Sequence, residues 1–226
     1  LMVNGLGELD QTNADAIMQW LSANGALYWM YTVMRMIGRV AFPIFCFLLV
    51  EGFLHTHDVK KYAMRLGLFA LLSEIPFDLA FSSKILEFNY QNVFFTLFIG
   101  LLTMIAYRAV EEKEEWNQAL KVILYILIVA AGMALAYFLK TDYAEKGVFC
   151  IMVLYIFRKK KMWQIIAGCA SFIWETPALF GFIPIAFYNG TRGWKMKYFF
   201  YIFYPAHLLI LYLLCYFMGI SGYSAV

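Results

Sequence analysis

The hydrophobic pattern divides the chain into long apolar runs that are separated by short polar loops. Five runs are long enough for a membrane helix, at residues 33–54, 62–82, 92–110, 119–140 and 198–219. Each has about the 20 residues that a helix needs to cross the hydrocarbon core of a bilayer. A shorter run covers 148–157, and the apolar stretch 162–189 is interrupted by glycines and prolines. The pattern predicts an all-α, polytopic integral membrane bundle of about seven to nine membrane helices.

The first part of the chain has a different character. Residues 1–32 mix glycine, asparagine and aspartate with a modestly apolar stretch, and several aromatic side chains follow from Trp20 onward. This composition predicts an extramembrane lead-in with one helix at the membrane interface, attached to a single transmembrane domain over 1–226. The sequence starts at Leu1 rather than at methionine, which is typical of a piece that lacks an upstream first helix.

Composition and charge placement set the class and the orientation. Hydrophobic residues make up 63% of the chain and charged residues only 15%, whereas soluble domains are roughly half apolar and a quarter charged. The loops at 55–65, 108–121, 158–161 and 189–197 hold thirteen lysines and arginines, against three in the opposite loops. This bias places the basic loops in the cytoplasm.

The same orientation constrains residues 162–189, which must leave and return on one face. Their 28 residues are too few for two helices of about 20 residues each. A broken, re-entrant hairpin with its Glu-Thr-Pro tip inside the protein resolves the conflict. A single long span, which would reverse the last helix, is the alternative.

Three ionisable residues interrupt the first apolar run. Arg35 and Arg39 are four positions apart and share a helix face, and Glu51 follows nearer the cytoplasmic end. Charges at membrane depth are costly and normally face a bundle interior or a wet cavity. The three residues therefore indicate a polar site. The alternative is that they extend to the two membrane surfaces as anchors.

The second run carries Glu74 and Asp78, one helical turn apart with Pro76 between them. Two acids on one face in hydrocarbon repel each other unless a cation or a shared proton separates them. Arg35 and Arg39 are the expected partners. One interpretation is a charge network that fixes helix packing, and the other is a cavity that binds and deprotonates a substrate.

Further polar residues lie at the ends of the apolar runs. His207 follows Pro205 and Tyr204 in the last run, where a histidine is either a hydrogen-bonded core residue or a catalytic base. Asn92 and Asp142 are candidate substrate-binding residues. No metal is expected, because the His55–His57 pair lacks a third ligand and the cysteines are isolated.

Basic residues at the cytoplasmic ends suit a phosphorylated ligand. They are Lys60, Lys61, Arg65 and Arg192. The alternative is ordinary anchoring of a membrane protein by positive loops.

The chain resembles the TraX family over roughly 34–210, through five segments in order: RMIGRVAFPIFCFLLVEGFLHT, KKYAMRLGLFALLSEIPFDLAF, NVFFTLFIG, DYAEKGV and YNGTRGWKMKYFFYIFYPAHL. The family is named for a protein that acetylates the N-terminus of conjugative pilin. The resemblance implies a membrane enzyme related to acyl-coenzyme A-dependent transmembrane acyltransferases. Such proteins usually open with a helix that bears an Asp-His pair, which does not precede Leu1.

The resemblance and the buried charges together give one hypothesis. Acetyl-coenzyme A enters from the cytoplasm, bound by Lys60, Lys61, Arg65 and Arg192. An acceptor amine or hydroxyl, on a peptide, glycan or lipid, occupies a cavity formed by Arg35, Arg39, Glu51, Asn92, Asp142 and Tyr204. Catalysis falls to His207, Glu74 and Asp78. Membrane lipids are expected partners and nucleic acid is not. The alternative function is a transporter or channel in which the charges form a proton or solute path.

Overall fold

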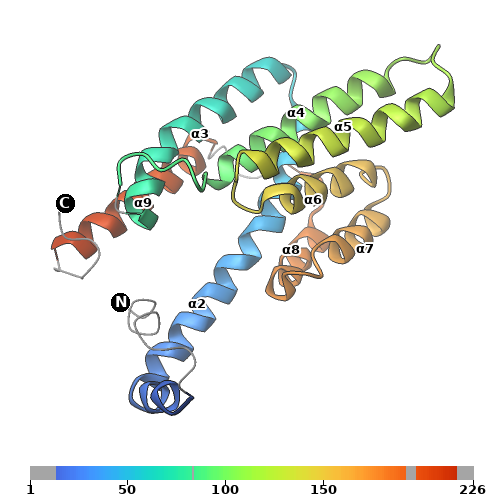
Figure 1. The fold of residues 1–226 in the computed structure, drawn as a ribbon. Coiled ribbons are helices and arrows are strands. Elements are labelled where there is room, and N and C mark those ends of the chain that lie inside the picture. The colour runs from blue at the N-terminus through green and yellow to red at the C-terminus, as the bar shows by residue number, and fades with distance from the viewer. Residues whose placement is uncertain (1–13, 83, 192–196, 218–226) are drawn as a thin grey trace.

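A computed structural model describes residues 14–82, 84–191 and 197–217, and this part of the chain is helical apart from its loops (Figure 1). The long helices are α2 (Ala14–His55), α3 (Val59–Ser82), α4 (Val93–Glu111), α5 (Gln118–Phe138) and α9 (Lys197–Phe217). The shorter ones are α6 (Ala144–Ile156), α7 (Lys161–Ser171), α8 (Phe182–Phe187) and the 3₁₀ helix η1 (Thr176–Gly181). The all-α prediction is confirmed, and most predicted runs coincide with a helix to within a few residues.

Among the described residues, three helices are long and apolar enough to cross a membrane: Asn24–His55, Val93–Glu111 and Gln118–Phe138. They make the chain a helical membrane protein. The predicted number of seven to nine membrane helices is not established by these three. The helix α3 has the required length, but it carries two carboxylates and several basic residues.

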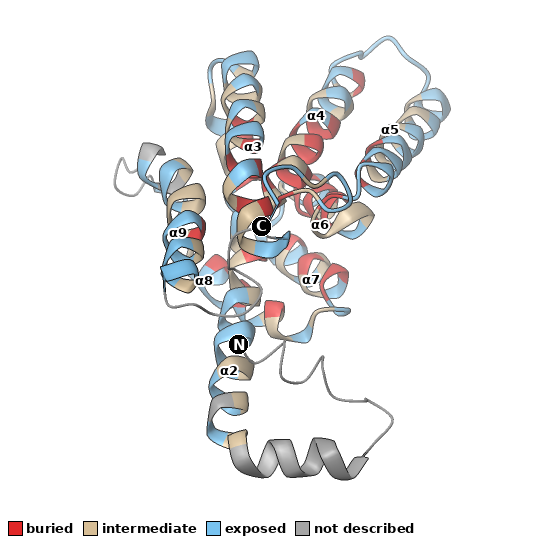
Figure 2. Ribbon diagram, turned by 60° about the vertical axis from the view of Figure 1, so that its left-hand side comes forward, coloured by how far each residue is buried: buried red, intermediate tan, exposed pale blue. Residues whose placement is uncertain are grey.

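The lead-in does not form a separate element. Helix α2 runs without interruption through the predicted boundary at residue 32, and the break in its helical geometry lies earlier, at Asn24 (φ −121°, ψ 18°). Residues 1–13 of the predicted lead-in lie outside the described part. Residues 33–38 of α2, which include Arg35, are exposed and lie where this helix projects from the bundle (Figure 2).

The core lies where α2, α3, α4 and α6 meet. Cys46, Val50, Phe53, Leu101 and Tyr155 are among its fully buried side chains. Helix α9 packs along α3. Helix α5 contacts α4 and α6 on one side only and exposes the rest of its surface. Helix α2 packs against α6 and α4, whereas α3 packs against α4 and α9.

Residues 161–188 fold back on themselves. Helix α7 leads away from the basic turn, η1 reverses the chain, and α8 returns, so that the Lys161 ammonium reaches the carbonyl of Tyr188. The two ends of the segment therefore meet. This is the fold-back that the charge pattern predicts, and its depth in the membrane stays a prediction.

The tip of this hairpin lies directly on α2 through Gly181. A methyl group added there would lie 2.7 Å from the carbonyl oxygen of Val40 and 2.6 Å from Cγ of Pro43. The backbone oxygen cannot move without moving α2. A residue without a side chain is therefore required at this contact.

We expect Gly181→Ala to lower the stability of the folded protein by about 1–3 kcal/mol, the usual effect of overpacking. The measurement is the thermal unfolding midpoint in detergent. Gly38→Ala is the matched control. Gly38 lies on α2, the helix that Gly181 contacts, and has no atom within 4 Å of an added methyl group. Equal midpoints for the two variants would contradict the close contact.

Candidate functional site

Two loops meet at the end of the bundle opposite the basic loops. The loop before α4 and the loop before α6 are joined by a bridge between Gln91 and Thr141. The amide of Gln91 donates to the Lys140 carbonyl (3.0 Å), and the amide of Asp142 donates to the Gln91 carbonyl (2.8 Å). These bonds hold the polar residues of both loops beside the ends of α3, α4 and α6.

An ion pair ties the hairpin to α2 next to these loops. Nη1 of Arg39 lies 2.8 Å from Oε2 of Glu175, and both side chains are more than two-thirds buried. The guanidinium also lies over the ring of Tyr143, 5.9 Å from its centroid, and that ring stacks on Phe42. The prediction that Arg39 pairs with Glu74 and Asp78 is wrong, because its partner is Glu175 from the hairpin tip.

The loop before α6 adopts a strained backbone. Lys140, Tyr143 and Ala144 have φ values of 52°, 63° and 41°, in the left-handed region. Such conformations cost non-glycine residues about 1–3 kcal/mol each and are often found at functional sites. Tyr143 lies beneath the Arg39 guanidinium, and α6 begins immediately after Tyr143, at Ala144.

Asp142, in the loop before α6, is bound to Tyr90, the residue that precedes Gln91 in the loop before α4. Oη of Tyr90 donates to Oδ1 of Asp142 at 2.6 Å. Burial raises the pKa of the Asp142 carboxyl, although the Tyr90 hydroxyl and the nearby Arg39 act in the opposite direction. Burial is also the main cause that raises the pKa of Tyr143, to about 12. The phenol of Tyr143 is therefore un-ionised at neutral pH.

Glu74 is fixed by Asn92, the residue that caps the N-terminus of α4. Nδ2 and the backbone amide of Asn92 both donate to Oε2 of Glu74, the second at 3.3 Å. Nδ2 also donates to the Ala70 carbonyl (2.8 Å), and Oδ1 accepts from the amide of Phe94 (3.0 Å). Asn92 is fully buried, and Glu74 is 8% exposed.

Three oxygen atoms beside this arrangement have no partner in the described part of the chain. They are Oε1 of Glu74, Oδ1 of Asp78 and Oγ of Ser73. Asp78 is 1% exposed, and its other oxygen accepts from the amide of Glu87 at 2.8 Å. Buried acceptors without a donor are costly. These atoms therefore mark a place where a proton or a donor group of a ligand would be stabilised.

Tyr204 and His207 approach from α9. The Tyr204 hydroxyl lies within electrostatic reach of Glu74 and Asp142. Nδ1 of His207 lies 2.8 Å from the Phe203 carbonyl. If Nδ1 carries the hydrogen of this bond, Nε2 is the atom able to accept a proton. We call Arg39, Glu74, Asp78, Tyr90, Asn92, Asp142, Tyr143, Glu175 and Tyr204 the outer polar cluster.

Three predicted members do not join the outer polar cluster: Arg35, Glu51 and His207, whose ring packs on Phe203 and Tyr204 of its own helix. Arg35 donates to the hydroxyl of Tyr31 (2.9 Å) on an exposed turn of α2, because α2 has left the bundle there. Glu51 follows Arg39 by twelve residues, which corresponds to about 18 Å along a helix. Glu51 lies beside His55 and Tyr188 at the basic end. The prediction of one cavity that contains Arg35, Glu51 and the acids is therefore wrong.

Three of the four predicted phosphate-binding residues, Lys60, Lys61 and Arg65, lie in the N-terminal part of α3 at the basic end. Lys60 is exposed, and the ammonium of Lys61 lies 3.1 Å from Asp58. Asp58 also caps α3 by accepting from the amide of Lys61 (2.9 Å). Arg65 lies beside Tyr201, and its Nε is buried without an acceptor in the described chain. Arg192 lies outside the described residues.

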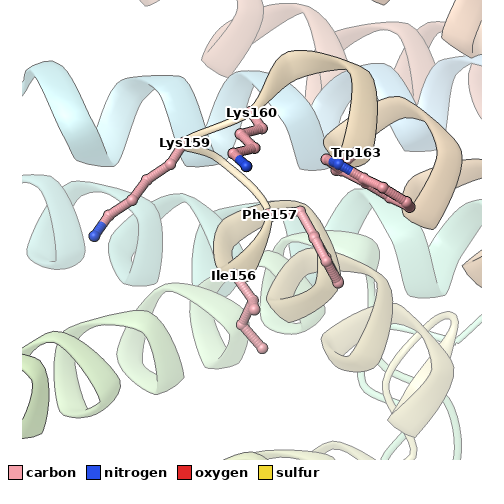
Figure 3. Close-up of a pocket in the computed structure, with 5 residues that line it drawn as sticks. All are labelled: Ile156, Phe157, Lys159, Lys160 and Trp163. Carbon is pink, nitrogen blue, oxygen red and sulfur yellow. The ribbon is translucent and has the colours of Figure 1, made fainter.

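Figure 3 shows a pocket of about 420 Å³ at the turn between α6 and α7, at the basic end. It is lined by Ile156, Phe157, Lys159, Lys160 and Trp163. A second pocket of about 530 Å³ lies between α2 and η1, lined by Met36, Ile37, Val40, Thr176, Pro177 and Phe180. Neither is lined by Glu74 or Asp78, so these two pockets are not the cavity that the sequence predicts around the acids.

The structure adds Tyr90, Tyr143 and Glu175 to the residues that sequence reasoning selected. A signal for Glu175 was present, because a carboxylate followed by Thr-Pro interrupts an apolar segment. Tyr90 and Tyr143 had no distinguishing signal among the sixteen tyrosines of the chain. Among the described residues, no group of three or more His, Cys, Asp and Glu side chains is placed to hold a metal ion.

Comparison with known proteins gives the family. The family described as "TraX protein" matches residues 15–215, and the chain therefore belongs to the TraX family. The chain is also similar to a protein of Dichelobacter nodosus named "Probable fimbrial assembly protein FimC, serogroup H1". The two are 27% identical over 208 residues, which cover 81% of this chain and 83% of the relative. No solved structure matches the chain significantly.

The two loop aspartates are expected to give opposite pH dependences. The pKa of Asp142 is raised by burial, so ionising it costs stability as the pH rises through its folded-state value. The pKa of Asp58 is lowered by its hydrogen bond from Lys61, so its contribution is lost as the pH falls. We expect Asp142→Asn to gain stability relative to the wild type with rising pH, and Asp58→Asn to gain it with falling pH.

Thermal unfolding midpoints in detergent across the acid range test this pair. Each variant keeps a side-chain oxygen that can accept the local hydrogen bond, so the charge is the main change. The same direction of pH dependence in both variants would contradict the assigned environments.

Proposed function

We propose that this protein is a membrane acetyltransferase of the bacterial cytoplasmic membrane. It transfers an acetyl group from cytosolic acetyl-coenzyme A to an amine or hydroxyl of an acceptor at or across the membrane. TraX-family membership supports this class. The observation that carries the proposal is the pair of buried carboxylates, Glu74 and Asp78, each with one oxygen bound by the protein and one oxygen free.

The free oxygens suit proton transfer. In acyl transfer the acceptor nitrogen or oxygen attacks the thioester carbonyl and must lose its proton, and a positioned carboxylate or imidazole takes it. Glu74 and Asp78 present free oxygens, and His207 on α9 presents Nε2. The new C–N or C–O bond forms as the C–S bond breaks, and the proton passes to the departing coenzyme A thiolate. The number of protons and electrons is unchanged.

Donors for the oxyanion intermediate are present in the outer polar cluster. The Tyr204 phenol lies near Glu74, and the Tyr143 phenol lies beside the Arg39 guanidinium. Donors placed in a site that excludes water stabilise developing negative charge strongly. Arg39 is already neutralised by Glu175, so we assign it to holding the hairpin and Tyr143 in place.

The basic end suits the nucleotide of acetyl-coenzyme A. Lys60, Lys159 and Lys160 are exposed there, and the Trp163 and Phe157 rings line the adjoining pocket. Phosphates attract ammonium groups, and an adenine ring packs well on an aromatic side chain. Helix α6 separates this pocket from the outer polar cluster by thirteen residues, or about 20 Å. A long acyl carrier is needed to span that distance.

The relative named as a fimbrial assembly protein bears on the acceptor. We propose that the acceptor is a pilus or fimbrial component, and that a free amine at its N-terminus receives the acetyl group. A glycan or lipid acceptor presents the same nucleophile to the same carboxylates. The acceptor is therefore the part of the proposal that the site chemistry constrains least.

The proposal predicts loss of acetyl transfer when a carboxylate is neutralised. We expect Glu74→Gln and Asp78→Asn each to lower the rate by about 10²-fold or more, the effect of losing a general base. The measurement is release of coenzyme A thiol from acetyl-coenzyme A by protein in lipid nanodiscs, with a peptide amine as acceptor. Glu112→Gln is the matched control, because Glu112 forms an exposed ion pair with Arg108 at the basic end.

Wild-type rates in both carboxylate variants would refute the assigned roles. Solute flux into liposomes by a wild-type protein that releases no thiol would replace the enzyme with the transporter alternative.

A further inference from the structure

We propose that Asn92 is a positioning residue that aims the free oxygen of Glu74 at the acceptor nucleophile. The inference rests on the proposed acetyltransferase function, and it names which of the possible bases acts first. Asn92 touches Glu74 through two donors and leaves only Oε1 of the carboxylate without a bond. A carboxylate held at one oxygen and free at the other has a fixed direction for accepting a proton.

The side chain of Asn92 has no freedom to serve another purpose. Its Oδ1 accepts from Phe94 as the cap of α4, and its Nδ2 is divided between Ala70 and Glu74. The residue is fully buried. The Nδ2 bonds therefore connect α3 with the start of α4, and the Oδ1 bond caps α4 itself. Substrate binding, the role predicted from the sequence, would require breaking one of these bonds.

The N-terminus of α4 adds a second influence on Glu74. The first amides of a helix carry partial positive charge, which stabilises a carboxylate nearby. One such amide, that of Asn92 itself, donates to Oε2. This favours the ionised Glu74 that a general base requires, although burial of the carboxyl and, to a smaller extent, Asp78 on the same helix oppose it. In the described residues the other titratable group facing Glu74 is Tyr204 on α9.

Asp78 is oriented differently from Glu74. Its bound oxygen accepts from the amide of Glu87 in a loop, not from a helix terminus. The amide of Glu87 belongs to a connection whose neighbours are exposed. Of the two acids, Glu74 has the more rigid support, and we assign the first proton transfer to it.

The test is Asn92→Asp. Aspartate caps helices as well as asparagine does, but it removes the Nδ2 donor and places a second negative charge against Glu74. A like charge favours the protonated form of Glu74. We expect the rate of acetyl transfer at neutral pH to fall about tenfold or more, and the acid limb of the kcat/KM profile to move about one unit to higher pH, with partial recovery of activity in alkaline buffer.

Asn117→Asp is the matched control. Asn117 caps α5 in the same way, with its Oδ1 accepting from the amide of Ala119 at 2.9 Å, but it is exposed and forms no hydrogen bond with a carboxylate in the described part of the chain. We expect this variant to keep the wild-type rate and pH profile. Asn92→Ser gives a second variant that caps α4 without the amide donor, and its acid limb is expected to move in the same direction.

The outcomes separate the inference from the proposed function. A wild-type protein that transfers no acetyl group would contradict the function itself. An active wild type with an unshifted acid limb in folded Asn92→Asp or Asn92→Ser would overturn only the role of Asn92. Unfolding of both variants beside a folded Asn117→Asp would assign Asn92 to stability alone, which also overturns it.

Discussion

The ion pair between Arg39 and Glu175 is the contact on which the rest of the outer polar cluster depends. It joins the middle of α2 to the tip of the 161–188 hairpin, with both side chains largely buried. Charged groups that are buried among apolar side chains are costly unless they find partners in the protein. Once Arg39 is fixed, Tyr143 is held between its guanidinium and the ring of Phe42. The strained loop before α6 is thereby set in place.

The buried carboxylates on the opposite side of the cluster also need partners, but there they are bound by amides rather than by a cation. There the acids of α3 are met by amides: Asn92 holds Glu74, and the backbone of Glu87 holds Asp78. These amides satisfy one oxygen of each carboxylate and leave the other free. A purely architectural network would leave no buried acceptor unpaired. The unpaired oxygens are therefore the feature on which the proposed reaction site rests.

The positions of the helices and the buried acids could be predicted from the sequence, but which charged side chains pair with one another could not. Apolar runs, loop charges and the broken segment 162–189 predicted the order of elements, because hydrophobic length is a property of the chain alone. Glu74 and Asp78 were recognised for the same reason. The partner of Arg39 depends on how far the hairpin reaches along α2, which is decided by packing at Gly181. The prediction that Arg35 lies in the polar cavity was wrong because nothing in the sequence of its own helix indicates where the bundle ends.

A double-mutant cycle on Arg39 and Glu175 tests the central claim most directly. The two single substitutions, Arg39→Met and Glu175→Gln, each leave one charge without its partner, and the double variant removes both. The measurement is the free energy of unfolding of the wild type and the three variants in detergent. The account predicts a coupling of about 1 kcal/mol or more, in the range seen for residues in direct contact. Additive effects of the two substitutions would contradict it.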